Sequence, residues 1–203
     1  MIDQILLIIG ITTLVLVSPG PDMILVMRNT LLGGHRAGLQ TSAGILSGNL
    51  VHITYCVLGI GWLIAKSIVA FNVLKYCGAA YLVYLGIASF RTRPASLATE
   101  PVPSRHGRTW FVQGFVNNVL NPKGTLFYLG VFTLVITPET PVRNTIVLIV
   151  TMNLVCVMFW LLFVYTVDRP AVRKLIERSQ QTVHRVFGAL LIFLGVRLAL
   201  LDR

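Results

Sequence analysis

Six long apolar runs constrain this chain of 203 residues more than any other feature of its sequence. A helix needs about 20 apolar residues to cross the hydrocarbon core of a bilayer. Runs of that length predict membrane-spanning helices at 5–27, 39–64, 68–90, 111–136, 144–167 and 184–201. The sequence therefore predicts an all-α integral membrane protein with six transmembrane helices, folded as a single transmembrane domain over residues 1–203.

The composition excludes the main alternatives to a membrane protein. Hydrophobic residues make up 55% of the chain and charged residues 12%, and the mean hydropathy is +0.79. A soluble domain carries roughly 25% charged residues, and a disordered chain is poor in apolar residues. A cleaved secretory signal is not expected either, because the N-terminus lacks positive charge and the first apolar run ends in Ser18-Pro19-Gly20-Pro21.

The basic residues predict both the partners and the orientation of the chain. Lys and Arg number 17, and nearly all of them lie in short connections between the apolar runs, which favours lipid head groups over nucleic acid as partners. The first, third and fifth connections hold 11 of these basic residues. The opposite side of the membrane holds 5, and Lys75 is one of them. Because cytoplasmic loops are enriched in Lys and Arg, we expect the connections at 92–108 and 169–183 in the cytoplasm and both termini outside.

Nothing in the sequence predicts a metal or a cofactor. Cys56, Cys77 and Cys156 all fall inside apolar runs and form no CxxC pair, so we expect them to be small apolar residues of the interior. The aromatic residues Tyr128 and Trp160 are likewise interpreted as packing residues or interface anchors rather than as ligands.

The two halves of the chain resemble each other in order. Ser18-Pro19-Gly20 in the first span corresponds to Asn121-Pro122-Lys123 in the fourth, and Asn49 in the second span corresponds to Asn153 in the fifth. The segment 82–87 in the third span corresponds to 191–196 in the sixth. Because each half has an odd number of spans, this pattern predicts two inverted three-helix repeats, at about 1–95 and about 106–203, as is typical of secondary transporters.

Prolines are expected to break the first and fourth helices near mid-membrane. Proline removes a hydrogen bond inside a helix, and the freed carbonyl groups need a polar environment in lipid. Ser18 and Asn121 are suitable N-caps, each followed by a proline at the first helical position, so each break presents a helix N-terminus that favours a carboxylate. The alternative is that these prolines only bend the helices for packing.

Asp22 and Lys123 are interpreted as the two full charges deep inside the spans, beside the two breaks. A charge inside a membrane is costly and is therefore a candidate for function. We expect Lys123 to bind the substrate carboxylate and Asp22 to be its counter-ion when the site is empty. The alternative is a static ion pair that only holds the two halves together.

The second span adds polar candidates on a face of small residues. Gly44, Gly48, His52 and Cys56 recur every four residues, with Asn49 beside them, so Asn49 and His52 are expected to point into the interior. His52 is either a proton relay or a hydrogen-bonded packing residue. The predicted substrate-binding residues are Ser18, Pro19, Gly20, Pro21, Asp22, Asn49, His52, Asn121, Pro122, Lys123 and Asn153.

Three of these motifs in order resemble a known family. The segments 18–22 (SPGPD), 81–86 (YLVYLG) and 121–123 (NPK) are similar to those of the lysine exporter (LysE/RhtB-type) family of amino-acid exporters, and the resemblance covers essentially the whole chain. It implies a protein of the bacterial inner membrane that exports amino acids at the expense of the proton gradient. The family's first motif carries either Asp or Asn at the position of Asp22.

A secondary exporter with alternating access is therefore the predicted function, and catalysis is not expected. An ATP-driven pump would need a G-x-x-x-x-G-K-[ST] loop, which the sequence lacks. A channel and a membrane-embedded enzyme are the alternatives. Asp22 is the one deep carboxylate and Lys123 offsets it, which favours neutral substrates such as threonine, homoserine or leucine over lysine or arginine. A homo-oligomer is compatible with the sequence.

Overall fold

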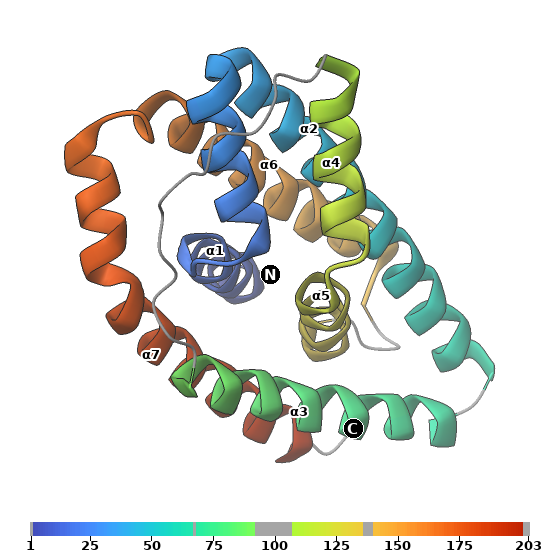
Figure 1. Cartoon of the computed structure of the whole chain (residues 1–203). Helices are drawn as coiled ribbons and strands as arrows, with labels where there is room; N and C mark the ends of the chain where they lie inside the picture. The colour runs from blue at the N-terminus through green and yellow to red at the C-terminus, as the bar shows by residue number, and fades with distance from the viewer. Residues whose placement is uncertain (1, 67, 92–106, 136–139, 201–203) are drawn as a thin grey trace.

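The computed structural model of the chain describes residues 2–66, 68–91, 107–135 and 140–200. Within these ranges the side chains at 60–66, 68, 70–71, 74, 107–108, 122–123 and 125–126 lie outside the description. The described helices are α1 (Ile2–Val17), α2 (Pro21–Lys66), α3 (Ile68–Arg91), α4 (Gly107–Val119), α5 (Pro122–Val135), α6 (Val142–Thr166) and α7 (Pro170–Leu200) (Figure 1). The predicted all-α fold is confirmed for this part of the chain.

Several of these helices have the length and apolarity of membrane spans. Among the described residues, the segments Pro21–Gly59, Val142–Thr166 and Pro170–Leu200 are long and apolar enough to cross a bilayer. The helices α4 and α5 have 13 and 14 residues, or about 20 Å each at 1.5 Å per residue, so neither crosses a core of about 30 Å alone. The layout of six spans in two inverted repeats stays a prediction.

The chain leaves the helical conformation at both predicted breaks. α1 ends at Val17 and α2 begins at Pro21, while α4 ends at Val119 and α5 begins at Pro122. The second break has the expected start, with Asn121 directly before the first helical proline. At the first break Ser18 is not the N-cap, because α2 begins at Pro21 and Gly20 directly precedes it; the N–H group of Ser18 donates to the carbonyl of Leu14 in α1. The α conformation is disfavoured for a residue that precedes proline, so Gly20 stays outside the helix. α2 therefore begins at Pro21, whereas Pro19 was the expected first residue.

The first connection, expected as a loop between spans ending at 27 and starting at 39, is helical. α2 runs through it, and only Gly34 departs from helical geometry, with φ 71° and ψ −176°. This backbone conformation is essentially restricted to glycine, which lets the chain bend sharply at a single residue. Figure 1 shows the first part of α2 meeting the longer second part at this bend.

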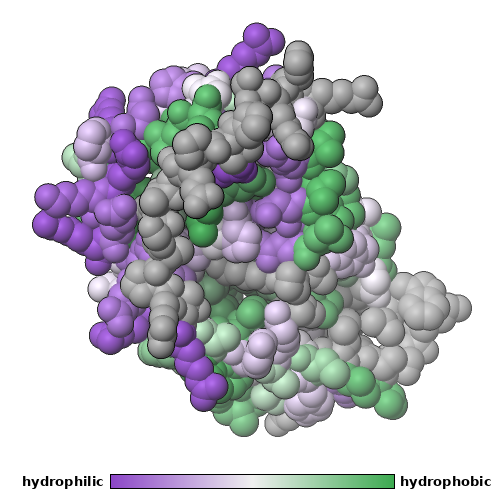
Figure 2. All heavy atoms as spheres, in the orientation of Figure 1, coloured by the Kyte–Doolittle hydropathy of each residue, from purple (hydrophilic) through white to green (hydrophobic). Residues whose placement is uncertain are grey.

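The connection predicted at 169–183 is helical as well. α7 begins at Pro170 and continues without a break to Leu200, and proline is favoured at the first position of a helix. Its first half is polar and exposed at Lys174, Glu177 and Arg178, and the hydrophilic surface gathers over it at the left of Figure 2. The charges that predicted a loop therefore lie on the solvated side of a helix.

Small residues let the helices pack closely in pairs. α2 packs along α4, and a Cβ atom added at Gly44 or Gly114 would overlap a backbone carbonyl oxygen, of Phe111 or Thr41 respectively. α3 packs along α7 in the same way, where a Cβ atom at Gly86 would lie 2.6 Å from the carbonyl oxygen of Gly188. Contacts between small residues are a common means of helix association in membranes.

α1 and α5 lie at the centre of the view in Figure 1, between α3 with α7 and α2 with α4. The larger apolar cluster joins these two helices to their neighbours, with Ile8 and Ile11 from α1, Phe132 from α5, and Leu148 and Leu191 from α6 and α7. The outer surface is also apolar, as at Leu58, Leu154 and Phe193, each at least 58% exposed. The central helices are therefore the ones whose polar ends can face an interior site.

Candidate functional site

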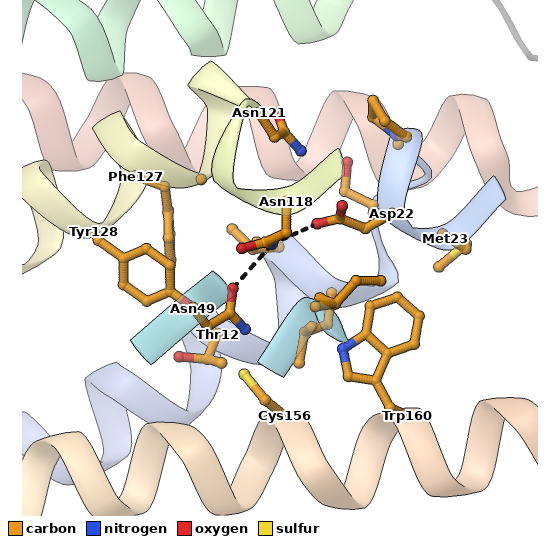
Figure 3. A pocket seen from close by; sticks show the side chains of 17 residues that line it. Thr12, Asp22, Met23, Asn49, Asn118, Asn121, Phe127, Tyr128, Cys156 and Trp160 are labelled. Atoms are coloured by element: carbon orange, nitrogen blue, oxygen red, sulfur yellow. Dashed lines mark hydrogen bonds between the residues drawn. The ribbon is translucent and has the colours of Figure 1, made fainter. Parts of the chain in front are cut away.

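A small polar cavity of about 60 Å³ lies where the two helix breaks meet. Ser18, Gly20 and Pro21 line it from the first break, and Asn121 from the second. Thr12 of α1, Asn49 of α2, Tyr128 of α5, and Cys156 and Trp160 of α6 complete most of its wall (Figure 3). Both interruptions therefore border one polar space, as helix breaks in lipid require.

Asp22 is the acidic residue of this cavity. Its two carboxylate oxygens accept hydrogen bonds from Asn117 Nδ2 at 2.6 Å and from Asn118 Nδ2 at 3.0 Å. Asp22 also lies in the first turn of α2, where the partial positive charge of the helix N-terminus favours an anion. Hydrogen bonds to a charged acceptor are among the strong ones in proteins. The last turn of α4 therefore holds this carboxylate in a fixed position.

Asn118 connects three elements around the cavity. Its side-chain amide donates to Asp22 and also to Asn49 Oδ1, at 3.0 Å each (Figure 3). Its backbone carbonyl lies near the end of α4, where carbonyl groups lack helical partners. That carbonyl accepts from the Asn121 N–H at 2.9 Å and contacts His52 Nε2 at 3.0 Å.

His52 lies one layer behind the cavity, with 1% of its surface exposed. Because a carbonyl oxygen can only accept, the contact with Asn118 places a proton on Nε2 of the imidazole. Nδ1 contacts the hydroxyl group of Tyr55 at 2.5 Å. The ring stacks on Tyr128, which lines the cavity, with centroids 5.9 Å apart. His52 thus contacts Asn118 and Tyr128 of the cavity wall on one side and the half-exposed Tyr55 hydroxyl on the other.

Three buried polar groups of the cavity wall have no hydrogen-bond partner among the described residues. They are the hydroxyl group of Thr12, the side-chain carbonyl oxygen of Asn118 and the indole N–H of Trp160, all on residues that are at most 3% exposed. An unsatisfied buried donor or acceptor costs about 1–3 kcal/mol. Such groups are rare in native structures and indicate a place where a polar ligand or water binds.

The structure brings most of the predicted site residues together. Ser18, Gly20, Pro21, Asp22, Asn49 and Asn121 line the cavity. Pro19 is buried but lines a separate hollow with Met23 and Phe163. Pro122 and Lys123 begin α5, and their side chains lie outside the described part, so the pairing of Lys123 with Asp22 stays a prediction.

Asn153 is not among the residues that line the cavity. It lies on α6 one turn from Cys156, and its amide donates to the carbonyl group of Ile149 in its own helix at 2.9 Å. Lys75 also differs from expectation, because it lies inside α3 and is 3% exposed instead of anchoring a connection. Its ammonium group lies 4.7 Å from the ring centroid of Tyr76, so the aromatic face compensates part of its burial.

Sequence reasoning missed the two amides that hold Asp22. Asn117 and Asn118 are adjacent polar residues in an otherwise apolar run, which was the available signal. Tyr128 and Trp160, interpreted as packing residues or interface anchors, line the cavity. Their positions depend on how α5 and α6 are rotated about their axes, which the sequence alone does not specify.

A helical protein with an apolar outer surface and a polar cavity at interrupted helices has the architecture of a membrane transporter. Comparison with known proteins gives the same class. A model of the LysE type translocator family matches residues 13–202, and the chain belongs to this family.

Relatives similar over nearly their whole length come from several bacteria. The membrane protein YrhP of Bacillus subtilis is 30% identical over 209 residues, which cover 97% of this chain and 99% of YrhP. A homoserine/homoserine lactone efflux protein of Salmonella typhimurium is 30% identical over 190 residues, or 93% of this chain and 92% of that protein. The membrane protein YahN of Escherichia coli is 25% identical, with 97% and 89% covered. No solved structure matches.

Proposed function

We propose that this protein exports a neutral amino acid across the bacterial inner membrane by alternating access, driven by the proton-motive force. The observation that carries the proposal is the Asp22 carboxylate, held by Asn117 and Asn118 in a cavity that both helix breaks border. A relative over nearly the whole chain is named as a homoserine/homoserine lactone efflux protein, which supports an amino acid as cargo.

The polar groups of the cavity match those of an α-amino acid. Asp22 is the acceptor for the ammonium group, because its carboxylate already lies at the cavity wall. Lys123 is the partner of the substrate carboxylate, and the indole N–H of Trp160 adds a second donor. Asp22 is the one carboxylate among the lining residues, so a second cationic group on the substrate would have no counter-charge there. A neutral side chain fits this charge balance.

The volume of the cavity supports a carrier that moves between states. Pockets that bind small molecules typically have volumes of about 300–1,000 Å³, whereas this cavity has about 60 Å³. An amino acid such as homoserine is larger than that, so the helices around the breaks must separate to admit it. In our proposal the two inverted repeats rock against each other around this site, and opening to one side closes the other.

Proton coupling is assigned to Asp22 and His52. His52 contacts the carbonyl oxygen of Asn118 on one side and the Tyr55 hydroxyl on the other, while the side-chain amide of Asn118 donates to Asp22. A proton taken up by the imidazole would therefore change the charge beside the residue that holds the carboxylate. The alternative for His52 is a purely structural hydrogen bond that fixes the end of α4.

Expression in a bacterial host that lacks its own amino-acid exporters tests this function. We expect one or a few neutral amino acids to accumulate in the medium when the protein is produced, and not when the Asp22→Asn, Lys123→Gln double variant is produced at the same level in the membrane. If the protein were a channel instead, amino acids would leave the cell without binding to a saturable site. An unchanged amino-acid profile across the neutral, cationic and acidic classes would reject the proposal.

A further inference from the structure

A second hollow lies beside the central cavity, between the first part of α2 and α4. Its volume is about 800 Å³, against about 60 Å³ for the central cavity. Pro21 and Asn121 line both spaces, so the two adjoin at the helix breaks and share these residues as a wall. This groove is large enough for an amino acid, whereas the central cavity is not.

One wall of the groove carries a stripe of polar residues beside apolar ones, and Val112, Val116 and Leu120 line the same wall. Thr109, Gln113 and Asn117 of α4 line it at a spacing of four residues, which places them on one face of the helix, and Asn121 continues the series at the break. From Thr109 to Asn117 the stripe extends about 12 Å at 1.5 Å per residue. It ends at the amide of Asn117, which donates to Asp22 at 2.6 Å.

Arg28 gives the groove a positive charge from the opposite helix. It lies six residues beyond Asp22 on α2, or about 9 Å along the helix axis. Arg28 forms no ion pair with any residue that the structure describes. A guanidinium group binds a carboxylate with two parallel hydrogen bonds, so this side chain is suited to the carboxylate of an amino acid.

We propose that the groove between α2 and α4 is the path by which the exported amino acid reaches the central cavity from the cytoplasmic side, with Arg28 as the first residue to bind its carboxylate. The inference rests on the proposed function for the identity of the cargo. The amino acid passes along the polar stripe of α4 with its ammonium group leading. It then meets Asp22, and its carboxylate transfers from Arg28 to the donors of the central site.

Water access along α4 tests the path without measuring transport. In a background with the three native cysteines replaced by alanine, single cysteines are placed at Thr109, Gln113 or Phe111 and treated with a membrane-impermeant methanethiosulfonate reagent in inside-out vesicles. Phe111 lies between the two stripe positions and is exposed, but it does not line the groove, so it is the control at matched depth. Because only a hydrated thiolate reacts, we expect Thr109→Cys and Gln113→Cys to react about tenfold faster than Phe111→Cys. Equal rates would overturn the path.

The role of Arg28 is tested in the same vesicles by uptake of labelled homoserine, threonine and leucine, which corresponds to export from the cell. Because a charge-assisted contact is lost, Arg28→Gln should raise the half-saturating concentration about tenfold with little change in maximal rate, and Arg28→Lys should restore most of the affinity. Arg36→Gln, an exposed arginine on the same helix, is the matched control. An unchanged half-saturating concentration for Arg28→Gln would overturn its assignment. Absence of transport with fast labelling of the stripe would instead reject the proposed function.

Discussion

In our proposal Trp160 has a role in substrate binding that lowers the stability of the empty protein. Its indole N–H is buried in the cavity wall with no partner among the described residues. A group that is satisfied only when substrate is bound destabilises the empty protein, and the same group then contributes to affinity. Stability and transport should therefore respond in opposite directions when this N–H is removed.

The substitution Trp160→Phe makes this prediction testable. It removes the buried donor and keeps an aromatic ring, so we expect the thermal stability of the purified protein in detergent to stay equal or to rise, since an unsatisfied donor costs about 1–3 kcal/mol. Export should fall, because the substrate loses a hydrogen bond. Trp110→Phe, on α4 outside the cavity, is the control. A lower stability together with unchanged export would contradict the assignment.

Asp22 and Lys123 are expected to act as a pair that the substrate separates. Lys123→Ala should abolish export, because it strands the carboxylate of Asp22, and breaking a buried pair on one side typically costs about 3–5 kcal/mol. Asp22→Asn should lose less, since an amide oxygen still accepts from an ammonium group. Export and membrane yield are measured together.

The double variant Asp22→Asn, Lys123→Gln separates this account from a static ion pair. It contains no unpaired charge, so we expect it to fold and to reach the membrane in normal amounts. It should nonetheless export nothing, because neither charged group of the substrate finds its partner. If the pair only held the two halves together, this variant would export at a near-normal rate.

At the scale of elements, the bend in α2 depends on one residue. Gly34 has φ 71°, and a Cβ atom there would meet nothing within 4 Å, so a substitution is penalised by the backbone alone. We expect Gly34→Ala to lower the free energy of unfolding by about 1–3 kcal/mol. Gly10→Ala in α1 is the control, since it also adds a Cβ atom to open space but at a helical conformation. Thermal unfolding in detergent compares the two, and equal stability would contradict the role of Gly34.

Local rules explain which elements were predictable. The helix breaks follow from proline and from the residue before it, so their positions were correct within two residues. The predicted loops at 28–38 and 169–183 were wrong, because a single glycine can turn the chain and because polar residues can cover one side of a helix. Charge density indicated contact with water in both cases, but it did not exclude a helix.

The site was predictable where it coincides with the breaks. Asp22, Asn49 and Asn121 carry signals in the sequence alone, as polar residues inside apolar runs. The role of Asn118 depends on the register between α4 and α2, which brings its amide between Asp22 and Asn49. Such contacts between distant segments follow from the packing of Gly44 against α4 and not from spacing along the chain.

For the molecule as a whole, the distribution of basic residues predicts the orientation in the membrane. Single cysteines at Ser104 and Gln181 should escape a membrane-impermeant maleimide added to intact cells, because both lie in the basic segments expected in the cytoplasm. A cysteine at Val142, which is 75% exposed in the first turn of α6, should react. If both basic segments are labelled and Val142→Cys is protected, the orientation is the opposite of the predicted one. The groove between α2 and α4 would then open to the outside and not to the cytoplasm.

If this protein is a carrier whose substrate binds at the two helix breaks, it exchanges bound substrate across the membrane, and counterflow in proteoliposomes measures that exchange. Vesicles are loaded with unlabelled homoserine, threonine or leucine and diluted into a trace of the same labelled amino acid. A carrier exchanges the two, so we predict that the label rises transiently above its equilibrium level inside the vesicles for at least one of the three. Vesicles with the Asp22→Asn, Lys123→Gln variant should show no such rise. Simple equilibration of the label without overshoot, or an equal overshoot with the double variant, would contradict the account.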